Sequence, residues 1–160
     1  MREKIYDRAA ALEYARRWAL DRNDKYYNFD KIGGDCTSFV SQCLYAGAKV
    51  MNYTPNTGWY YRSAYDRTAS WSGVEYLFEF LVNNSSAGPY AHTVSEHEVE
   101  PGDIVQLGRK EKRFYHTLVI TATAPAITVA AHSYDALDIL LSSYRYEYAR
   151  FLHIDGVRKW

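Results

Sequence analysis

The chain has 160 residues, of which 48% are hydrophobic and 24% are charged, the profile of an ordinary globular domain. Its 19 basic and 19 acidic side chains cancel, so it lacks the basic surface that most nucleic-acid-binding proteins carry. No apolar run approaches the roughly 20 residues that a membrane span requires. We therefore expect one domain over residues 1–160 that neither binds nucleic acid nor spans a membrane.

The first half of the chain is patterned as helices. Apolar residues recur at helical spacing in three stretches: Asp7 to Leu20, Asp35 or Cys36 to Gly47, and Ser72 to about Val82. Asp35 is a natural N-cap for the second stretch, and the spacing of Ser72 and Glu75 is that of a capping box opening the third. The aromatic segment 51–71 has little periodicity, and we expect an ordered excursion across the surface there.

The second half is patterned as strands. Four short apolar runs are typical of strands: Ile104–Leu107, Phe114–Thr121, Ile127–His132 and Phe151–Val157. The breaks at 108–113 and 123–125 are short enough to force antiparallel pairing of the first three. Helices followed by strands predict an α+β fold, with the helices packed on an antiparallel sheet.

The second predicted helix begins with a cysteine. Cys36 follows Gly33-Gly34-Asp35, and the unpaired N–H groups of a helix start favour thiolate over thiol. An ionised Asp35 opposes this effect, and the Cys36 N–H is a candidate oxyanion donor. Cys43 lies two turns further along the apolar stripe, about 10.5 Å of rise away, too far for a disulfide. We expect Cys43 to be core and Cys36 to be a candidate nucleophile.

The predicted strands supply two histidines. If the turn at 123–125 holds three residues, His116 lies directly across from His132, with Cβ atoms about 5 Å apart. One imidazole would then be the general base for Cys36 while the other orients it. A turn of two residues would instead place the two rings on opposite faces of the sheet. A zinc site made of the same three residues is the alternative, but close ligand pairs are missing, so we expect no metal.

Other chemistries find less support. His92 and His97 lie in a polar, acidic stretch that we expect to be a solvated loop, and His153 in the last strand is expected to be structural. The serines after Cys36 lack a nucleophile elbow, and no phosphate-binding glycine loop is present. We expect no cofactor.

The motifs resemble a bacterial family described as "Putative amidase domain". The resemblance covers almost the whole chain and rests on these segments: 26–30, 34–44, 58–61, 101–104, 116–120, 131–136 and 141–144, together with Trp71. That family is similar in turn to the NlpC-type cell-wall cysteine peptidases, whose fold is papain-like. The resemblance implies a nucleophile at Cys36, a general base at His116 and a third polar group at His132, with Asp135 as its rival.

The same resemblance bears on the substrate and the compartment. We expect Asp35, Trp59, Tyr60 and Trp71 to contact the substrate. NlpC-type enzymes commonly carry Ser-Gly after the cysteine, whereas this chain has Thr37-Ser38, so their specificity is not carried over. Those enzymes usually act outside the cytoplasm. The charged start of this chain is no signal peptide, so it is cytoplasmic as written unless an export signal lies outside this sequence.

The sequence thus predicts a cysteine amidohydrolase or peptidase that cleaves an amide or peptide bond through an acyl-enzyme, with cell-wall-type peptides among the candidate substrates. Two alternatives stay open. One is acyl transfer by the same Cys36, His116 and His132, and the other is a non-catalytic module whose aromatic groove binds a peptide or glycan.

Overall fold

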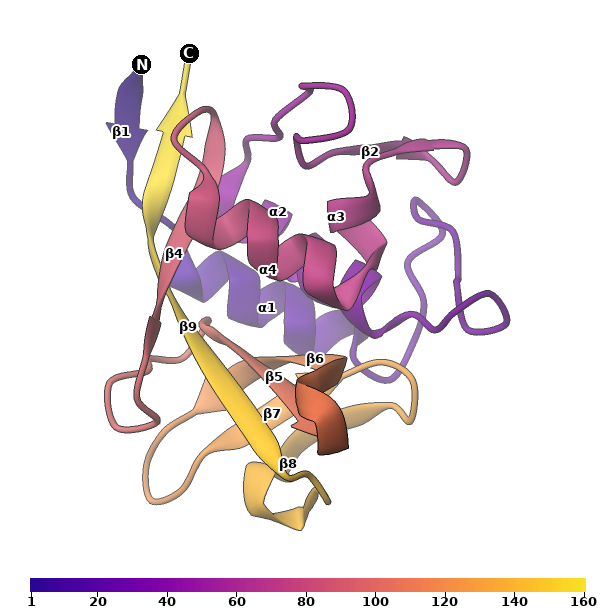
Figure 1. Ribbon diagram of the computed structural model, residues 1–160, viewed down its shortest axis with the longest axis vertical. Coiled ribbons are helices and arrows are strands. Elements are labelled where there is room, and N and C mark those ends of the chain that lie inside the picture. Colours follow the sequence, from indigo (N-terminus) through magenta and orange to yellow (C-terminus); the bar gives the residue numbers. More distant parts are fainter.

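The computed structural model describes residues 1–160, except for the side chain of Lys112 (Figure 1). Its helices are α1 (Arg8–Trp18), α2 (Cys36–Ala48), α3 (Ala69–Ser72) and α4 (Val74–Asn83). Its strands are β1 (Arg2–Lys4), β2 (Tyr61–Ser63), β3 (Asp66–Arg67), β4 (Gly88–Val94), β5 (Ile104–Arg109), β6 (Arg113–Ala122), β7 (Thr128–Ala131), β8 (Ala136–Leu140) and β9 (Tyr148–Lys159). Among the helices of the described residues, none is long and apolar enough to cross a bilayer.

One antiparallel sheet carries the fold. Its order is β1-β9-β5-β6-β7-β8, and the long strand β9 also pairs with β4. Figure 1 shows the helices gathered on one side of this sheet, with α1 lying beside α2. One core lies between the helices and the sheet, and a second lies on the other face, around Leu107, Leu118 and Ile120. The prediction of a mixed helix and strand fold with an antiparallel sheet is confirmed at this level.

The first two helices pack closely because small side chains separate them. Ala11, Ala15 and Ala19 have no exposed surface and lie in the same core as the apolar face of α2. Asp7 caps α1 by accepting a hydrogen bond from the backbone N–H of Ala10 at 3.0 Å. At Gly47, near the end of α2, a Cβ would lie 2.5 Å from the Tyr6 ring, so this close approach requires glycine. Together these contacts fix α2, and hence its first turn, on the sheet.

Two local predictions are corrected. The third predicted helix begins at Val74, with Gly73 at its N-cap position, because a separate short helix, α3, precedes it. Ser72 therefore forms no capping box, and its hydroxyl accepts a hydrogen bond from Arg67 Nε at 3.0 Å. The segment around His92 is not a loop. It is strand β4, and His92 contacts Asp155 across the pairing with β9.

The register of β6 and β7 also differs from the prediction. The strands are joined by residues 123–127, and a bulge shifts the pairing between Ile120 and Ala122. As a result Val119 lies opposite Ala130. Continued past the end of β7, this register brings Thr117, and not His116, opposite the position of His132. The predicted cross-strand pairing of the two histidines is therefore wrong.

A buried carboxylate joins the start of α1 to the sheet. Asp103 has no exposed surface and accepts hydrogen bonds from Arg8 Nη1 and His153 Nδ1, each at 2.8 Å. The backbone N–H groups of Glu100 and Ile154 also donate to it. Each lone-pair direction of this carboxylate is thus used, as its burial requires.

Replacing this carboxylate should destabilise the fold. Asp103→Ala leaves the partly buried Arg8 guanidinium and two backbone N–H groups without their acceptor, so the free energy of unfolding should fall by about 3–5 kcal/mol. Urea denaturation at pH 7 measures this. The matched control is Asp155→Ala, which removes the exposed contact with His92 and should cost less than about 1 kcal/mol. Equal losses in the two variants would contradict the role of Asp103.

Candidate active site

Cys36 is the first residue of α2 and lies against strand β6. Its side chain is only 7% exposed, and Thr37 Oγ1 lies 3.8 Å from the sulfur. The Thr37 hydroxyl in turn makes a 2.9 Å hydrogen bond with that of Thr117. The backbone of Thr117 also provides a hydrogen bond to Cys36. The first turn of α2 therefore packs on β6 at Thr117.

Burial decides the resting state of this thiol. Desolvation raises the pKa of Cys36, the hydrogen bonds from Thr117 and Thr37 lower it, and the charge of Asp35 raises it further. The net direction is upward. Burial thus acts against the thiolate that a helix start favours. Cys43 has no exposed surface, and burial raises its pKa well above the ordinary value, as a core thiol requires.

His116 is the residue before Thr117 on β6. Its ring is 8% exposed and packs between Tyr115, at 6.3 Å between ring centroids, and Tyr144, at 6.0 Å. Desolvation lowers the pKa of His116 to about 4, so the imidazole is neutral at pH 7 and has a free lone pair. Among the described residues, none forms a hydrogen bond with this ring, and Cys36 does not do so either.

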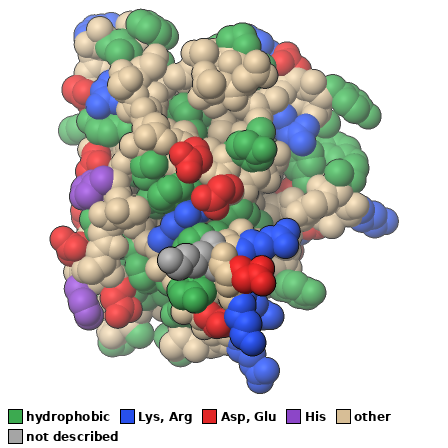
Figure 2. All heavy atoms as spheres, viewed as in Figure 1, with side chains coloured by type: hydrophobic (Ala, Val, Ile, Leu, Met, Phe, Trp, Pro, Cys, Tyr) green, Lys and Arg blue, Asp and Glu red, His purple; other side chains and the backbone are tan. Residues whose placement is uncertain are grey.

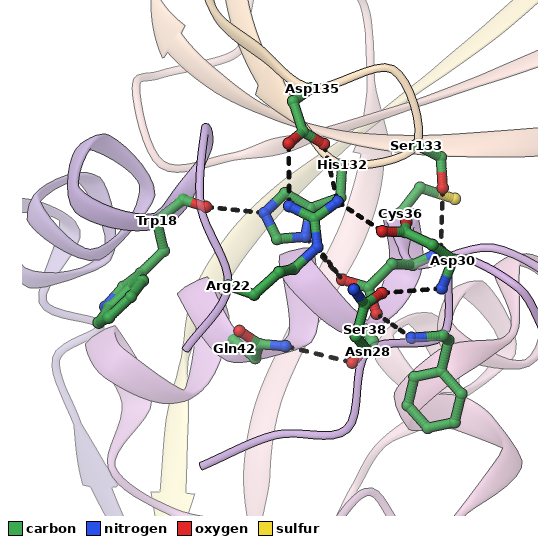
Figure 3. A network of polar contacts seen from close by, with 12 residues as sticks. Trp18, Arg22, Asn28, Asp30, Cys36, Ser38, Gln42, His132, Ser133 and Asp135 are labelled. Carbon is green, nitrogen blue, oxygen red and sulfur yellow. Dashed lines mark hydrogen bonds and ion pairs between the residues drawn. The ribbon is translucent and has the colours of Figure 1, made fainter. Parts of the chain in front are cut away.

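His132 lies on the helix side of the sheet and is fully engaged. Its Nδ1 is 2.6 Å from Asp35 Oδ2, and its Nε2 is 2.7 Å from the carbonyl oxygen of Trp18. The ring stacks on Phe39 of α2 at 4.0 Å between centroids. Both His132 and Asp35 are 1% exposed. Figure 3 shows the imidazole held between Trp18 and the start of α2.

This geometry corrects the role predicted for His132. A carbonyl oxygen only accepts, so Nε2 carries a hydrogen and donates it to Trp18, while Nδ1 faces Asp35. No ring nitrogen is left to orient His116. The rival Asp135 does not do so either, because both of its oxygens accept from Arg22 at 2.9 Å.

Arg22 is the residue of this network that the sequence did not reveal. It forms ion pairs with Asp30 at 2.8 Å and Asp135 at 2.9 Å, and its Nε lies 3.8 Å from Asp35. Figure 3 shows its guanidinium between the 20–35 segment and the turn after β7. Its acidic partners are scattered along the chain, so no spacing rule could have indicated it. Arg22 ties three segments together at the start of α2.

The chain just before Cys36 is held by the same groups. Asp35 accepts a 2.9 Å hydrogen bond from the Phe29 N–H, and its own N–H donates to Ser133 Oγ at 2.9 Å. Asp35 therefore occupies the predicted N-cap position without capping α2 through its side chain. Gly34 has φ of +96°, and a Cβ there would lie 3.3 Å from Ser133 Oγ. This turn needs glycine, which explains the Gly33-Gly34 pair.

The aromatic residues predicted to contact substrate lie elsewhere. Trp59 and Trp71 have no exposed surface and pack against each other in the main core, at 5.0 Å between ring centroids. They present nothing for a substrate to touch, so that expectation is corrected for both. Tyr60 is partly exposed, and its hydroxyl donates to Asp66 at the β2–β3 hairpin. Asp35 is buried and bonded to His132.

Two shallow cavities flank the tyrosines around His116. One, of about 460 Å³, is lined by Tyr144 to Glu147 and Arg109, and the other, of about 410 Å³, is lined by Tyr115 and neighbouring basic residues. Among the described residues, no group of three or more His, Cys, Asp or Glu could hold a metal ion. The candidate groups are the Cys36 thiol, the neutral His116 imidazole and the buried network behind the helix start.

The neutral state of His116 should link stability to pH. An unfolded imidazole has a pKa near 6.5, whereas that of His116 in the fold is about 4, so the unfolded state binds the proton first. Stability contributed by His116 is then complete above pH 6.5 and lost as the pH falls toward 4. Between pH 7 and 5, wild type should lose about 2 kcal/mol more of its unfolding free energy than His116→Gln. Urea denaturation measures both, and equal losses would contradict the buried neutral ring.

Comparison with known proteins assigns the chain to a family. The family model described as "Putative amidase domain" matches residues 5–154, and its name indicates amide hydrolysis at a coarse level. The uncharacterized protein YhbB of Bacillus subtilis (strain 168) is 37% identical over 121 residues, covering 73% of this chain but only 37% of YhbB. No solved structure matches, so the likeness to NlpC-type enzymes and a papain-like fold stays a prediction. Since the family model covers nearly all of its residues, the chain belongs to the family described as "Putative amidase domain".

Proposed function

We propose that the protein is a cysteine-dependent amide hydrolase in which Cys36 is the nucleophile and His116 is the general base. One observation carries this proposal. The sulfur at the start of α2 lies against the backbone of Thr117, directly after a buried imidazole whose lone pair is free at neutral pH. A thiol at a helix start whose N–H groups are unpaired is suited to attack on a carbonyl, and a neutral imidazole is the group that can accept its proton.

The reaction follows from the two neutral groups. As the Cys36 sulfur attacks the amide carbon, His116 accepts the thiol proton, and the carbonyl oxygen takes the negative charge. The backbone N–H groups at the start of α2 stabilise that oxygen. His116 then returns the proton to the amine as the C–N bond breaks, leaving a thioester on Cys36. A water molecule gives a proton to His116 and attacks the thioester, which releases the acid and restores the thiol.

His132 acts in this proposal as a positioning residue. It holds Asp35, the residue before the nucleophile, while Arg22 and Ser133 hold the rest of the same turn. Small shifts in a nucleophile cost rate steeply, so a buried and fully bonded support is suited to this task. Within the described part of the chain no residue supports His116 in this way, and burial keeps its imidazole neutral.

The nucleophile is tested with a peptide library. Purified protein incubated with a mixture of short peptides should yield cleavage products by mass spectrometry, and Cys36→Ser should reduce their rate of formation at least a thousandfold because the hydroxyl is a far weaker nucleophile here. Cys43→Ala, which changes the core thiol of the same helix, should retain activity. Cleavage that survives in Cys36→Ser would overturn the proposal.

The pH dependence separates the two histidines. In kcat/KM for a cleaved peptide, the acid limb should lie near pH 4, because His116 accepts a proton only while neutral. His116→Gln should remove nearly all activity. His132→Gln should lower kcat while leaving the acid limb in place, since this ring moves no proton. If the acid limb shifts in His132→Gln, the assignment of the general base to His116 is wrong.

A further inference from the structure

A cavity of about 600 Å³ lies away from Cys36, near the opposite end of α2. Its walls are the 52–58 loop, the outward face of α4 and the turn at 83–86, while Asn52 follows soon after the last residue of α2. The 13 residues of α2 span about 20 Å. This cavity is therefore separate from the proposed active site, and nothing in the proposed reaction uses it.

The walls of this cavity are held rigidly. Asn52 is 6% exposed, donates to the carbonyl oxygen of Ala87 at 2.9 Å and accepts from the N–H of Thr54 at 3.0 Å. Asn84 donates to the carbonyl oxygens of Ala87 and Pro89. At Gly58 a Cβ would lie 2.2 Å from the Asn52 carbonyl oxygen, so only glycine allows the loop to pass this close. The cavity is thus preformed.

Other groups in the lining are left free. Tyr76 is 63% exposed on α4, and its ring lies against Gly73, where a Cβ would come within 2.9 Å. Glu79 lies one turn further along the same face and uses one oxygen to accept from Asn83. Among the described residues, none hydrogen-bonds to the Tyr76 hydroxyl, the second Glu79 oxygen or the side chains of Asn56 and Ser85. These groups are available to a ligand.

The chemistry of the lining selects among ligands. Among the described residues, Asn, Ser and Thr are the most frequent in the lining and no Lys, Arg or His contributes to it, so an anion finds no positive countercharge. Amides and hydroxyls both donate and accept, which matches a ligand with many hydroxyl groups. An exposed aromatic ring offers a flat apolar face beside them. Figure 2 shows much tan in the upper part of the face that carries α4, the colour of the backbone and of side chains that are neither hydrophobic nor charged.

We infer that this cavity binds a neutral oligosaccharide, with the Tyr76 ring against one face of a sugar and the Glu79 carboxylate accepting from its hydroxyls. The site is independent of Cys36, so it can exist whether or not the proposed hydrolysis is correct. It would place a carbohydrate and an amide substrate on the same domain at distinct positions.

The test is a titration followed by NMR on the full chain. Maltotriose, cellotriose and chitotriose are each added to ¹⁵N-labelled protein, and at least one should give saturable shifts in the 52–58 and 83–86 amides. Tyr76→Ala should weaken that binding at least tenfold, and Glu79→Gln should weaken it severalfold. Both residues are exposed, and the spectra themselves show whether each variant is folded. The control Tyr65→Ala, at a fully exposed position outside the cavity, should change nothing.

Three outcomes would overturn the inference. The first is that none of the three sugars gives saturable shifts, and the second is that the shifts survive in both cavity variants. The third is that a neutral tripeptide binds in the cavity while the sugars do not, which would make it a peptide site. Because the readout is binding, loss of hydrolysis in Cys36→Ser has no effect on any of them.

Discussion

The contact between His132 and Asp35 is the constraint on which the candidate site depends. Both side chains are removed from water, so each must find its partners inside the protein. The imidazole does so with Asp35 on one side and the Trp18 carbonyl at the end of α1 on the other. Breaking such a buried pair leaves an unsatisfied group at the start of α2. The position of Cys36 therefore depends on three segments that are far apart in the sequence.

Burial also sets the chemistry of the two reactive groups. It raises the pKa of the Cys36 thiol and lowers that of the His116 imidazole, so both are uncharged at rest. A preformed thiolate and imidazolium pair would be costly in this environment. Proton transfer from sulfur to nitrogen must instead accompany the attack on a carbonyl, when the developing oxyanion meets the N–H groups of α2. The proposed hydrolase is in this sense a general-base enzyme.

The strongly periodic elements were predictable from the sequence. Helices α1 and α2 and strands β5, β6 and β9 have apolar faces at their own periods, and each was expected within a few residues. Strand β4 was missed because its outer residues, among them His92, are polar and face solvent. The register of β6 and β7 was missed because a bulge between Ile120 and Ala122 shifts the pairing by one residue, which changes its parity.

The site was predictable only in part. Cys36 and His116 carry local signals, a helix start and an apolar strand. In the structure Cys36 lies on the helix side of β6 near Thr117, whereas His116 pairs with Leu107 and faces the other side of the sheet. The contacts of His132 depend on the side of the sheet on which its ring lies. A register error of one residue places the ring on the opposite side. Arg22 has no local signal, since its partners Asp30 and Asp135 meet only in the folded chain. Long-range ion pairs of this kind cannot be found by spacing.

The central claim is that Cys36 forms an acyl intermediate and that His116 activates the water that hydrolyses it. The most direct measurement mixes the protein with p-nitrophenyl acetate and follows the mass of its cysteine-containing peptides by mass spectrometry after rapid quenching. We expect an acetyl group on Cys36 that appears with a burst of p-nitrophenolate and then disappears in wild type. In His116→Gln, any acetyl group that forms should persist, because no base activates the water. Acetylation confined to other residues, or release from Cys36 at the wild-type rate in His116→Gln, would contradict the account.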